Sequence, residues 1–273
     1  MVPPDAPPDV LVERWSFVES LPVADLWLPD HTANYGNRHA DQLDSWAMVA
    51  AAAVCTTRLR IGTLASNMVL RPPVMLARAA IAVDNLSGGR LELGIGSGFT
   101  RFDHDAVGVP FWPMAERMAR FGEYWDVVRQ ALAGAVDYRG RYVNATASPQ
   151  PLASQVPVPL VACGGSRAVL DIAVRSAAGW NTHGPYDAAH DPTITFAIER
   201  NRELTSRCLE AGRDPRSLRR SFLFVGSTDP FADPVRATDD VARLRAAGFD
   251  ELVAIWPKHT HSDALAALVS ATG

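Results

Sequence analysis

Residues 58–98 constrain the fold more than any other part of the chain. A short strand-like run, residues 59–64, leads through a polar turn into an apolar segment that begins at Pro72-Pro73. Proline favours the first helical position and glycine the residue after the last, so a helix is predicted from here to Gly88-Gly89. A second strand, residues 90–95, ends in a glycine-spaced loop. Strand, helix and strand in this order predict a parallel βαβ unit.

The same alternation continues along the chain of 273 residues. Further strands are predicted at residues 24–28, 158–162, 179–182, 220–225 and 251–256, with helices between them. Residues 1–3 resemble the end of one more strand, but the prolines that follow deny it ladder donors. This pattern predicts an α/β fold, a (β/α)8 TIM barrel whose first strand is truncated or missing. We expect one domain over residues 1–273, with a small hairpin insertion near residues 135–150.

The carboxyl ends of the strands are where a barrel of this class places its chemistry. Those ends are predicted at residues 29–31, 64–67, 94–98, 163–166 and 181–183. Small and turn-forming residues dominate several of them, so the backbone there can approach a flat or anionic ligand closely. We therefore expect the functional residues to lie at these five ends.

Composition excludes several functional classes. A net charge of -4 without a basic run argues against nucleic acid or an anionic membrane as a partner. The sequence has no apolar stretch of membrane-spanning length, and its first residues lack the features of a signal peptide, which predicts a cytoplasmic protein. Cys55, Cys163 and Cys208 lie far apart, so neither a disulfide framework nor a thiolate metal site is expected.

Five segments in the same order resemble the bacterial luciferase-like monooxygenase superfamily. They are LWLPDH, IGTLASNMVLRPPVMLARAAIAVDNLSGGRLELGIGSGF, YRGRYV, VACGGSRAVLDIAVRSAAGWNTHG and VARLRAAGFDELVAIW. The superfamily includes enzymes that use flavin mononucleotide (FMN) and enzymes that use the deazaflavin coenzyme F420. Each motif alone is weak, and the glycines of residues 94–98 do not have the spacing of the dinucleotide-binding fingerprint.

The resemblance implies a cofactor site at the predicted strand ends. The flavin or deazaflavin ring leans on a bulge after the third strand, which often contains a non-prolyl cis peptide; the matching bond is Leu64–Ala65. The implied phosphate site is the helix start at Gly164, Gly165 and Ser166, where N–H groups and the helix dipole favour an anion. An alternative is that these glycines only make a tight turn. The full set of implied cofactor-binding residues is Leu64, Ala65, Ser66, Asn67, Gly94, Gly96, Ser97, Gly98, Cys163, Gly164, Gly165, Ser166, Asn181 and Thr182.

Asp30 and His31 are the predicted catalytic residues. In the F420-dependent branch of the superfamily an Asp-His pair lies beside the ring and the histidine assists hydride transfer, as suits a group that titrates near neutrality. The alternative is a turn-capping aspartate beside a solvated histidine. Sugar-phosphate dehydrogenases of the superfamily have a glutamate after the glycine loop, where this chain has Phe99.

No metal site is predicted. The residues around His104, which stands between two aspartates, are expected to form a solvated loop. His259 and His261 have metal-ligand spacing but follow the last strand, whereas metal-dependent hydrolases of this fold carry such a pair after the first. A hydrolase is therefore disfavoured.

The sequence favours an oxidoreductase that transfers a hydride between F420 and a small organic substrate. The alternatives are an FMN-dependent monooxygenase that uses dioxygen and a non-catalytic relative that binds flavin or F420. The substrate is expected to be selected by residues 32–42, 99–113 and 185–190. The small side chains of residues 50–53 suggest helix packing in a homodimer.

Overall fold

The computed structural model describes residues 1–34, 39–148, 157–257 and 262–272. Its helices and strands alternate, and the parallel strands have the order β1-β2-β3-β6-β7-β8-β9, so the fold is α/β with a seven-stranded parallel sheet. The chain divides into two compact units. The N-terminal unit comprises residues 2–19 and 24–160, and the C-terminal unit comprises residue 1, residues 20–23 and residues 161–273.

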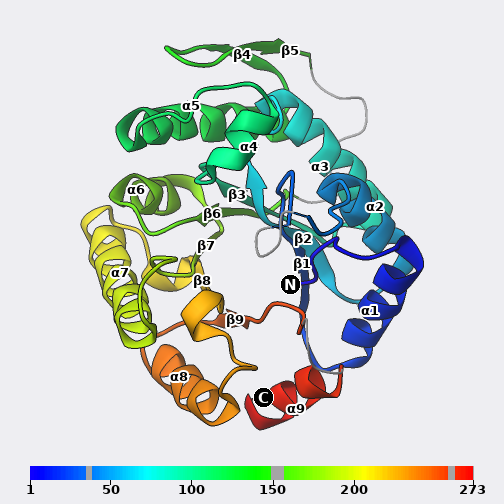
Figure 1. Ribbon diagram of the computed structural model, residues 1–273. Helices are drawn as coiled ribbons and strands as arrows, with labels where there is room; N and C mark the ends of the chain where they lie inside the picture. The colour runs from blue at the N-terminus through cyan, green and yellow to red at the C-terminus, as the bar shows by residue number, and fades with distance from the viewer. Residues whose placement is uncertain (35–38, 149–156, 258–261, 273) are drawn as a thin grey trace. The chain divides into compact units, whose positions relative to one another are not determined.

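The N-terminal unit is built on three parallel strands. These are β1 (Asp25–Leu28), β2 (Arg60–Asn67) and β3 (Leu91–Gly96), and residues 58–98 form the βαβ unit that the sequence predicts. Figure 1 shows the helices arranged along these strands, with the hairpin beyond α5. The helices are α1 (Pro8–Ser20), α2 (Ser45–Cys55), α3 (Pro73–Ser87), α4 (Arg101–Ala106) and α5 (Met114–Ala133), and the hairpin is β4 (Val136–Arg139) and β5 (Asn144–Ala147).

Local sequence explains where the central helices begin and end. Asp44 caps α2 by accepting a hydrogen bond from the Ala47 N–H at 2.9 Å. Proline at position 73 opens α3, and Gly88 closes it in the left-handed conformation with φ of 70°. Buried aliphatic residues of α3, among them Leu76 and Ile81, cover the sheet. These features fix the strand ends that carry the predicted site.

The C-terminal unit repeats the same pattern. Its strands are β6 (Leu160–Cys163), which begins one residue before the unit, β7 (Gly179–Thr182), β8 (Arg219–Leu223) and β9 (Glu251–Val253), paired in parallel. The α-helices α6 (Arg167–Ser176), α7 (His190–Glu210), α8 (Pro234–Ala246) and α9 (Asp263–Thr272) alternate with them. Two 3₁₀ turns, η1 (Pro215–Ser217) and η2 (Gly226–Thr228), lie on either side of β8.

The start of the chain makes backbone pairings without forming a regular strand. In the C-terminal unit, the amino group of Met1 donates to the Ala254 carbonyl at 2.6 Å, and the Trp256 N–H donates to the Met1 carbonyl at 2.8 Å. In the N-terminal unit, the Val2 N–H donates to the Trp27 carbonyl at 2.8 Å. The first strand of the described chain is β1, in agreement with the prediction of a truncated first strand.

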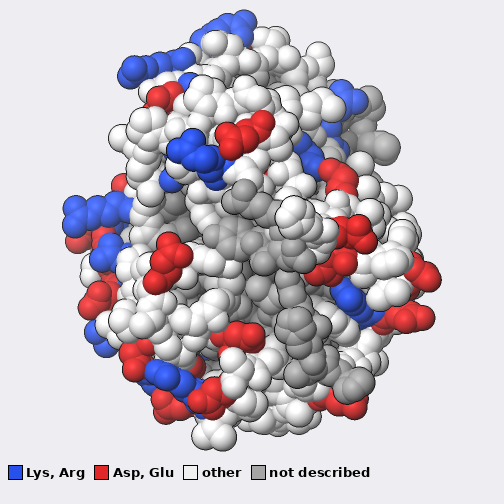
Figure 2. Space-filling model, viewed as in Figure 1, with Lys and Arg blue, Asp and Glu red and all other residues white. Residues whose placement is uncertain are grey.

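The structure corrects one sequence prediction in the segment after β3. Residues 101–106 form α4, and Asp103 and His104 are fully buried, whereas we expected a solvated loop. The predicted hairpin is confirmed, with its second strand at Asn144–Ala147. Among the described residues no helix is both long and apolar enough to cross a membrane. Figure 2 shows acidic and basic side chains interspersed over the visible face.

Candidate functional site

The bulge at the end of β2 is the first element of the candidate site. The Leu64–Ala65 peptide is cis, as predicted, and the pairing of β2 with β3 shifts register between Thr63 and Ser66. The hydroxyls of Thr63 and Ser66 lie 2.8 Å apart, and the indole N–H of Trp46 donates to the Ser66 hydroxyl at 3.0 Å. All three side chains are buried, so hydrogen bonds in the protein interior hold the bulge in shape.

The accessible part of these two strands is small. β2 is buried except at Arg60 and Ala65, and β3 is buried except at Gly96. A Cβ atom added at Gly96 would lie 3.3 Å from the Cβ of Ala65, so the two residues are adjacent. A methyl group beside exposed backbone is the kind of wall against which a planar ring can rest. Leu64 and Gly94 are buried behind this surface, and Ser97 is half-buried beside it.

Asn67, the last residue of β2, connects the bulge to neighbouring loops. Its N–H donates to Asp30 Oδ2 at 3.3 Å, and its side-chain amide donates to Asp103 Oδ2 at 3.0 Å. Its Oδ1 accepts from the Val69 N–H at 3.0 Å. A Cβ at Gly98, where φ is +66°, would lie 2.6 Å from this Oδ1. Asn67 therefore holds the neighbouring loops of the site together by hydrogen bonds.

Asp30 is buried and forms an ion pair with Arg71. Its Oδ2 accepts from the Arg71 guanidinium at 2.7 Å, and Arg71 also donates to Asp44 at 2.6 Å. Burial raises the pKa of Asp30 above its ordinary value, against the opposing effects of Arg71 and the Asn67 N–H. Because both Arg71 and Asn67 hold it from within the protein, Asp30 is placed to fix the loops after β1 and β2.

His31 lies three residues after the end of β1, and 19% of its side chain is exposed. Its Nδ1 lies 2.7 Å from Oδ2 of Asp103, which is on α4. The ring also lies against two aromatic rings of the segment after β3, with centroids 6.2 Å from Phe99 and 5.8 Å from Phe102. The structure thus brings His31 together with Asn67 on a single carboxylate.

Asp103 is the residue of this cluster that sequence reasoning missed. Burial alone would raise the pKa of its carboxyl, but the hydrogen bonds and charge of His31, with hydrogen bonds from Thr100 and Thr32, hold the pKa below its ordinary value. The one sequence feature that could have identified Asp103 as a site residue is its position shortly after the glycine loop. Its partners Asn67 and His31 lie 36 and 72 residues away in the chain, and no local pattern predicts them.

The predicted residues of the C-terminal unit form a second cluster at the start of α6. Ser166 caps the helix by accepting from the Val169 N–H, and Gly164, with φ of 135°, donates to the Asn181 carbonyl at 2.9 Å. A Cβ at Gly165 would lie 2.7 Å from the ring of Phe196, so any larger residue would require that ring to move.

The neighbouring strand ends support the same turn. The Asn181 amide donates to the Ser221 hydroxyl at 2.8 Å, and the Thr182 hydroxyl accepts from the Gly184 N–H at 3.3 Å. Cys163 is half-buried, and its thiol lies 3.5 Å from the Val161 carbonyl. The turn explanation and the phosphate explanation for these glycines are both compatible with this geometry.

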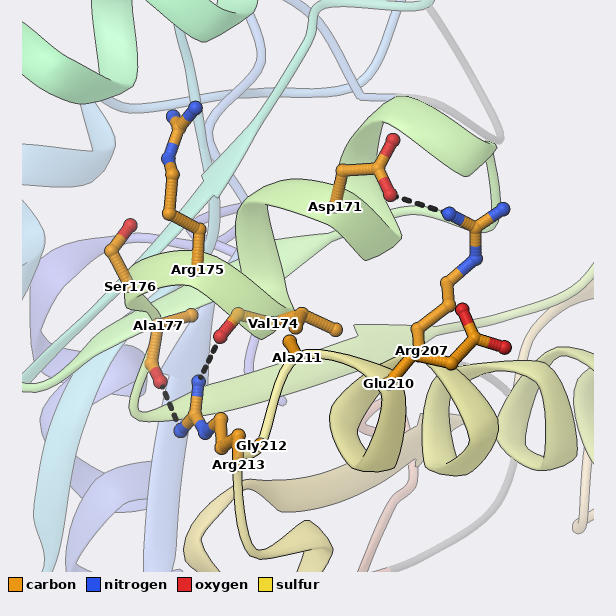
Figure 3. Close-up of a pocket in the computed structure, with 10 residues that line it drawn as sticks. All are labelled: Asp171, Val174, Arg175, Ser176, Ala177, Arg207, Glu210, Ala211, Gly212 and Arg213. Carbon is orange, nitrogen blue, oxygen red and sulfur yellow. Dashed lines mark hydrogen bonds and ion pairs between the residues drawn. The ribbon is translucent and has the colours of Figure 1, made fainter.

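A pocket of about 840 Å³ lies at the opposite end of α6 and contains none of the predicted site residues. Figure 3 shows that Arg213 donates to the carbonyls of Val174 and Ala177 and that Arg207 pairs with Asp171. Carbonyls at the end of a helix need such partners. We therefore assign Arg213 a structural role as the cap of α6.

No metal site is found among the described residues, since no group of three or more His, Cys, Asp or Glu side chains is placed to hold an ion. His104, which stood in a suggestive acidic run, uses both ring nitrogens on carbonyls, of Pro110 at 2.7 Å and Gly98 at 3.1 Å. His259 and His261 lie outside the described residues.

Comparison with known proteins decides the family. Residues 2–261 match the family model described as luciferase-like monooxygenase. The chain belongs to the luciferase-like monooxygenase family. Its members are oxidoreductases and monooxygenases, which supports enzymatic activity and small-molecule substrates.

Individual relatives show the range of this family. The chain is 29% identical over 238 residues to the pyrimidine monooxygenase RutA of Escherichia coli O81 (strain ED1a), covering 81% of this chain and 57% of RutA. It spans about half the length of the curated relatives that it matches.

Two solved structures share the fold. The coenzyme F420-dependent tetrahydromethanopterin reductase of Methanopyrus kandleri has a TM-score of 0.78 at 18% identity, covering 98% of this chain and 95% of the reductase. An F420-dependent secondary alcohol dehydrogenase in complex with an F420-acetone adduct has a TM-score of 0.79 at 16% identity, with 98% and 96% coverage. At such identities the likeness concerns the fold, and it confirms the predicted luciferase-like barrel class.

Proposed function

We propose that this member of the luciferase-like family is an oxidoreductase that transfers a hydride between coenzyme F420 and a small organic substrate. The observation that carries the proposal is the position of His31, at the end of β1 and bound through Nδ1 to buried Asp103, which also binds Asn67 of the β2 bulge. A histidine held in this way can exchange a proton with a reacting group at a strand end.

The residues fit a planar cofactor. Ala65 and Gly96 form a small surface that a larger side chain at Gly96 would disturb, because its Cβ would already lie 3.3 Å from Ala65. Leu64, Ser66, Asn67, Gly94, Ser97 and Gly98 shape this surface. F420, when bound, supplies the carbon that accepts or donates the hydride, while His31 is proposed to take up or return the accompanying proton.

The helix start at Gly164, Gly165 and Ser166 is proposed to receive a phosphate of the cofactor. Its support is local: α6 begins there, and the N–H groups and dipole of a helix start favour an anion. Cys163, Asn181 and Thr182 are proposed to line that turn. Replacing Gly165 with alanine should weaken cofactor binding, although the contact with Phe196 makes a stability measurement necessary alongside it.

A second candidate is an FMN-dependent monooxygenase that uses dioxygen. The match to pyrimidine monooxygenase RutA over 81% of this chain favours it. The two functions separate in one experiment, in which the purified protein is titrated with F420 and with FMN side by side and the binding is followed by absorbance. Tighter binding of FMN, with rapid oxygen consumption by its reduced form, would overturn the F420 proposal.

His31 provides the test of catalysis. Replacing His31 with alanine should lower kcat about 10²-fold or more, since general acid–base catalysis contributes roughly that much, while the Kd for F420 changes little. Unchanged kinetics in the variant would contradict the assignment. Binding of reduced F420 without turnover of any substrate would instead indicate the non-catalytic relative.

We also propose a homodimer and a cytoplasmic location, as expected from the sequence. Support for the dimer comes from exposed apolar side chains on neighbouring helices, with Val54 of α2 exposed at 63% and Met75 and Leu86 of α3 at 55% and 54%. Light scattering should give twice the chain mass, and Val54→Asp should shift the protein toward monomer. A monomeric wild-type protein at micromolar concentration would exclude the dimer.

A further inference from the structure

The carboxylate of Asp103, on α4, accepts hydrogen bonds on both of its oxygens. Its Oδ1 accepts from the N–H and the hydroxyl of Thr32, both at 2.8 Å. Its Oδ2 accepts from His31 Nδ1 at 2.7 Å, from the Asn67 amide at 3.0 Å and from the Thr100 hydroxyl. The side chain is completely buried. An ionised carboxylate can be buried in this way when its oxygens are fully hydrogen-bonded.

These donors come from three different strand ends. His31 and Thr32 follow β1, Asn67 ends β2, and Thr100 follows β3. One buried charge therefore ties together the three loops that carry the predicted ring surface and the predicted catalytic histidine. Removing the Thr100 hydroxyl would weaken the hydrogen bonding of the cluster and leave its charge unchanged. Removing the Asp103 carboxylate would change the hydrogen bonding and the charge together.

The His31 contact has a direct chemical consequence. A carboxylate only accepts hydrogen bonds, so the His31 nitrogen that faces it carries the proton. In the neutral ring Nδ1 is then the N–H, and Nε2 carries the lone pair. A proton taken up by Nε2 creates an imidazolium whose charge is balanced by the carboxylate at 2.7 Å.

We propose that Asp103 is the positioning residue of His31, holding the ring in one orientation and in the Nδ1–H tautomer so that Nε2 exchanges the proton with the substrate. This inference rests on the proposed function of His31 and extends it. When the substrate is oxidised, its C–H bond would break with the hydride passing to F420, its O–H or N–H bond would break, and the proton would form a bond to Nε2. When the substrate is reduced, the hydride would come from reduced F420 and the proton would return from Nε2. Asp103 keeps its charge throughout.

Other charged groups near the cluster make contacts of their own. Asp30, next to His31 in the chain, is paired with Arg71, and Arg71 also contacts Asp44. On α4 itself, Arg101 lies over the Phe111 ring at 4.8 Å and Asp105 is exposed. Asp103→Asn removes the charge and also replaces one acceptor oxygen by an NH2 donor, so Thr100→Val, which disturbs the cluster without removing charge, is its control.

The first measurement does not require cofactor. Nitrogen-15 spectra of the imidazoles, with the His31 signals assigned through His31→Ala, should show Nδ1 protonated and Nε2 unprotonated in the neutral wild-type ring. Asp103→Asn should give a mixture of tautomers, while Thr100→Val and Asp105→Asn should retain the wild-type pattern. Protonation of Nε2 in the wild-type protein would overturn the proposal whatever the activity.

The second measurement uses turnover of F420. Asp103→Asn should lower kcat about 10²-fold or more, with the Kd for F420 within about threefold of wild type, because an uncharged partner no longer enforces the tautomer. The acid limb of its pH–rate profile should move to lower pH, since the imidazolium loses its counter-charge. Asp239→Asn, which changes an exposed carboxylate of α8, should leave kcat and the profile unchanged.

The outcomes separate the two levels of inference. An Nδ1–H tautomer in a protein that binds FMN alone, or turns over nothing, would overturn the proposed function and leave the positioning of His31 standing. Loss of kcat in Thr100→Val as large as in Asp103→Asn, or an unshifted pH profile in Asp103→Asn, would mean that Asp103 only maintains the loops. That result would contradict positioning while leaving the proposed F420 activity intact.

Discussion

Gly98 lies so close to Asn67 that a single added carbon would collide with it. A Cβ at Gly98 would lie 2.6 Å from Asn67 Oδ1 and 2.5 Å from a methyl group of Val69. The backbone there is left-handed, with φ of +66°. The glycine loop after β3 therefore owes its sequence to a close approach within the protein, in addition to any ligand.

This contact predicts a difference between two alanine variants. Gly88→Ala has the same backbone cost, at φ of +70°, but meets nothing within 4 Å, so it should lower the unfolding free energy by about 1–2 kcal/mol. Gly98→Ala should lower it further and weaken cofactor binding, because Asn67 must move. Denaturant unfolding and F420 titration check both effects. Equal losses of stability would show that the contact is unimportant.

Asp103 predicts a pH dependence of stability. Its pKa is lowered in the folded protein, because hydrogen bonds from His31, Thr100 and Thr32 outweigh burial, which alone would raise it. The unfolded chain therefore binds the proton first as the pH falls, and stability is lost below about pH 4. Asp103→Asn cannot titrate, so its deficit in unfolding free energy relative to wild type should shrink over that range. A deficit that stays constant from pH 7 to pH 3 would contradict this.

Arg213 and Arg207 line the same pocket but should differ in their effect on stability. Arg213 donates to the carbonyls of Ala173, Val174 and Ala177 at 2.7 to 3.0 Å, and its loss would leave helix-end acceptors without their donor. Arg213→Ala should lower the unfolding free energy by about 1–3 kcal/mol.

Arg207 provides the matched comparison. It pairs with exposed Asp171 and with Glu203 of the same helix at 2.7 Å, and pairs at the surface contribute about 0–1 kcal/mol each. Arg207→Ala should therefore be nearly neutral, and neither variant should change F420 binding. A larger loss in Arg207→Ala than in Arg213→Ala, measured by denaturant unfolding, would reverse the assignment.

His104 should stabilise the segment after β3. It bridges the carbonyls of Gly98 and Pro110, and its ring lies 5.0 Å from the rings of both Phe111 and Trp112. His104→Phe preserves the aromatic contacts but removes the ring N–H that one of these buried carbonyls accepts from, so the unfolding free energy should fall by about 1–3 kcal/mol. Proteolysis within residues 98–112 should accelerate. An unchanged rate and stability would show that the bridge contributes little.

The fold was predictable because strands and helices are indicated by local patterns in the sequence. The βαβ unit of residues 58–98 combined helix start and stop signals with apolar strands, and the structure confirms it. The short helix α4 escaped prediction because its residues, with Asp103 and His104 among them, are polar. Their burial depends on partners at distant strand ends, which the local sequence does not reveal.

The candidate site was predictable in position and incomplete in detail. Strand ends gave the location of His31, Ala65 and Gly96, and the family resemblance gave the cis peptide at Leu64–Ala65. Asp30, which was predicted to be catalytic with His31, accepts hydrogen bonds from Arg71 and the Asn67 N–H, and these partners could not be predicted from the local sequence. Asp103 was not predicted, since its role depends on donors from three separated segments.

The hydrogen bond from the Trp46 indole to Ser66 has a practical consequence. Indole emission responds to changes in hydrogen bonding and local polarity, and Trp46 touches the residue directly after Ala65. The protein thus carries an optical reporter beneath the surface proposed to hold the ring. The difference in fluorescence between wild type and Trp46→Phe would register occupancy of that surface by any flat molecule, coloured or colourless, without a label.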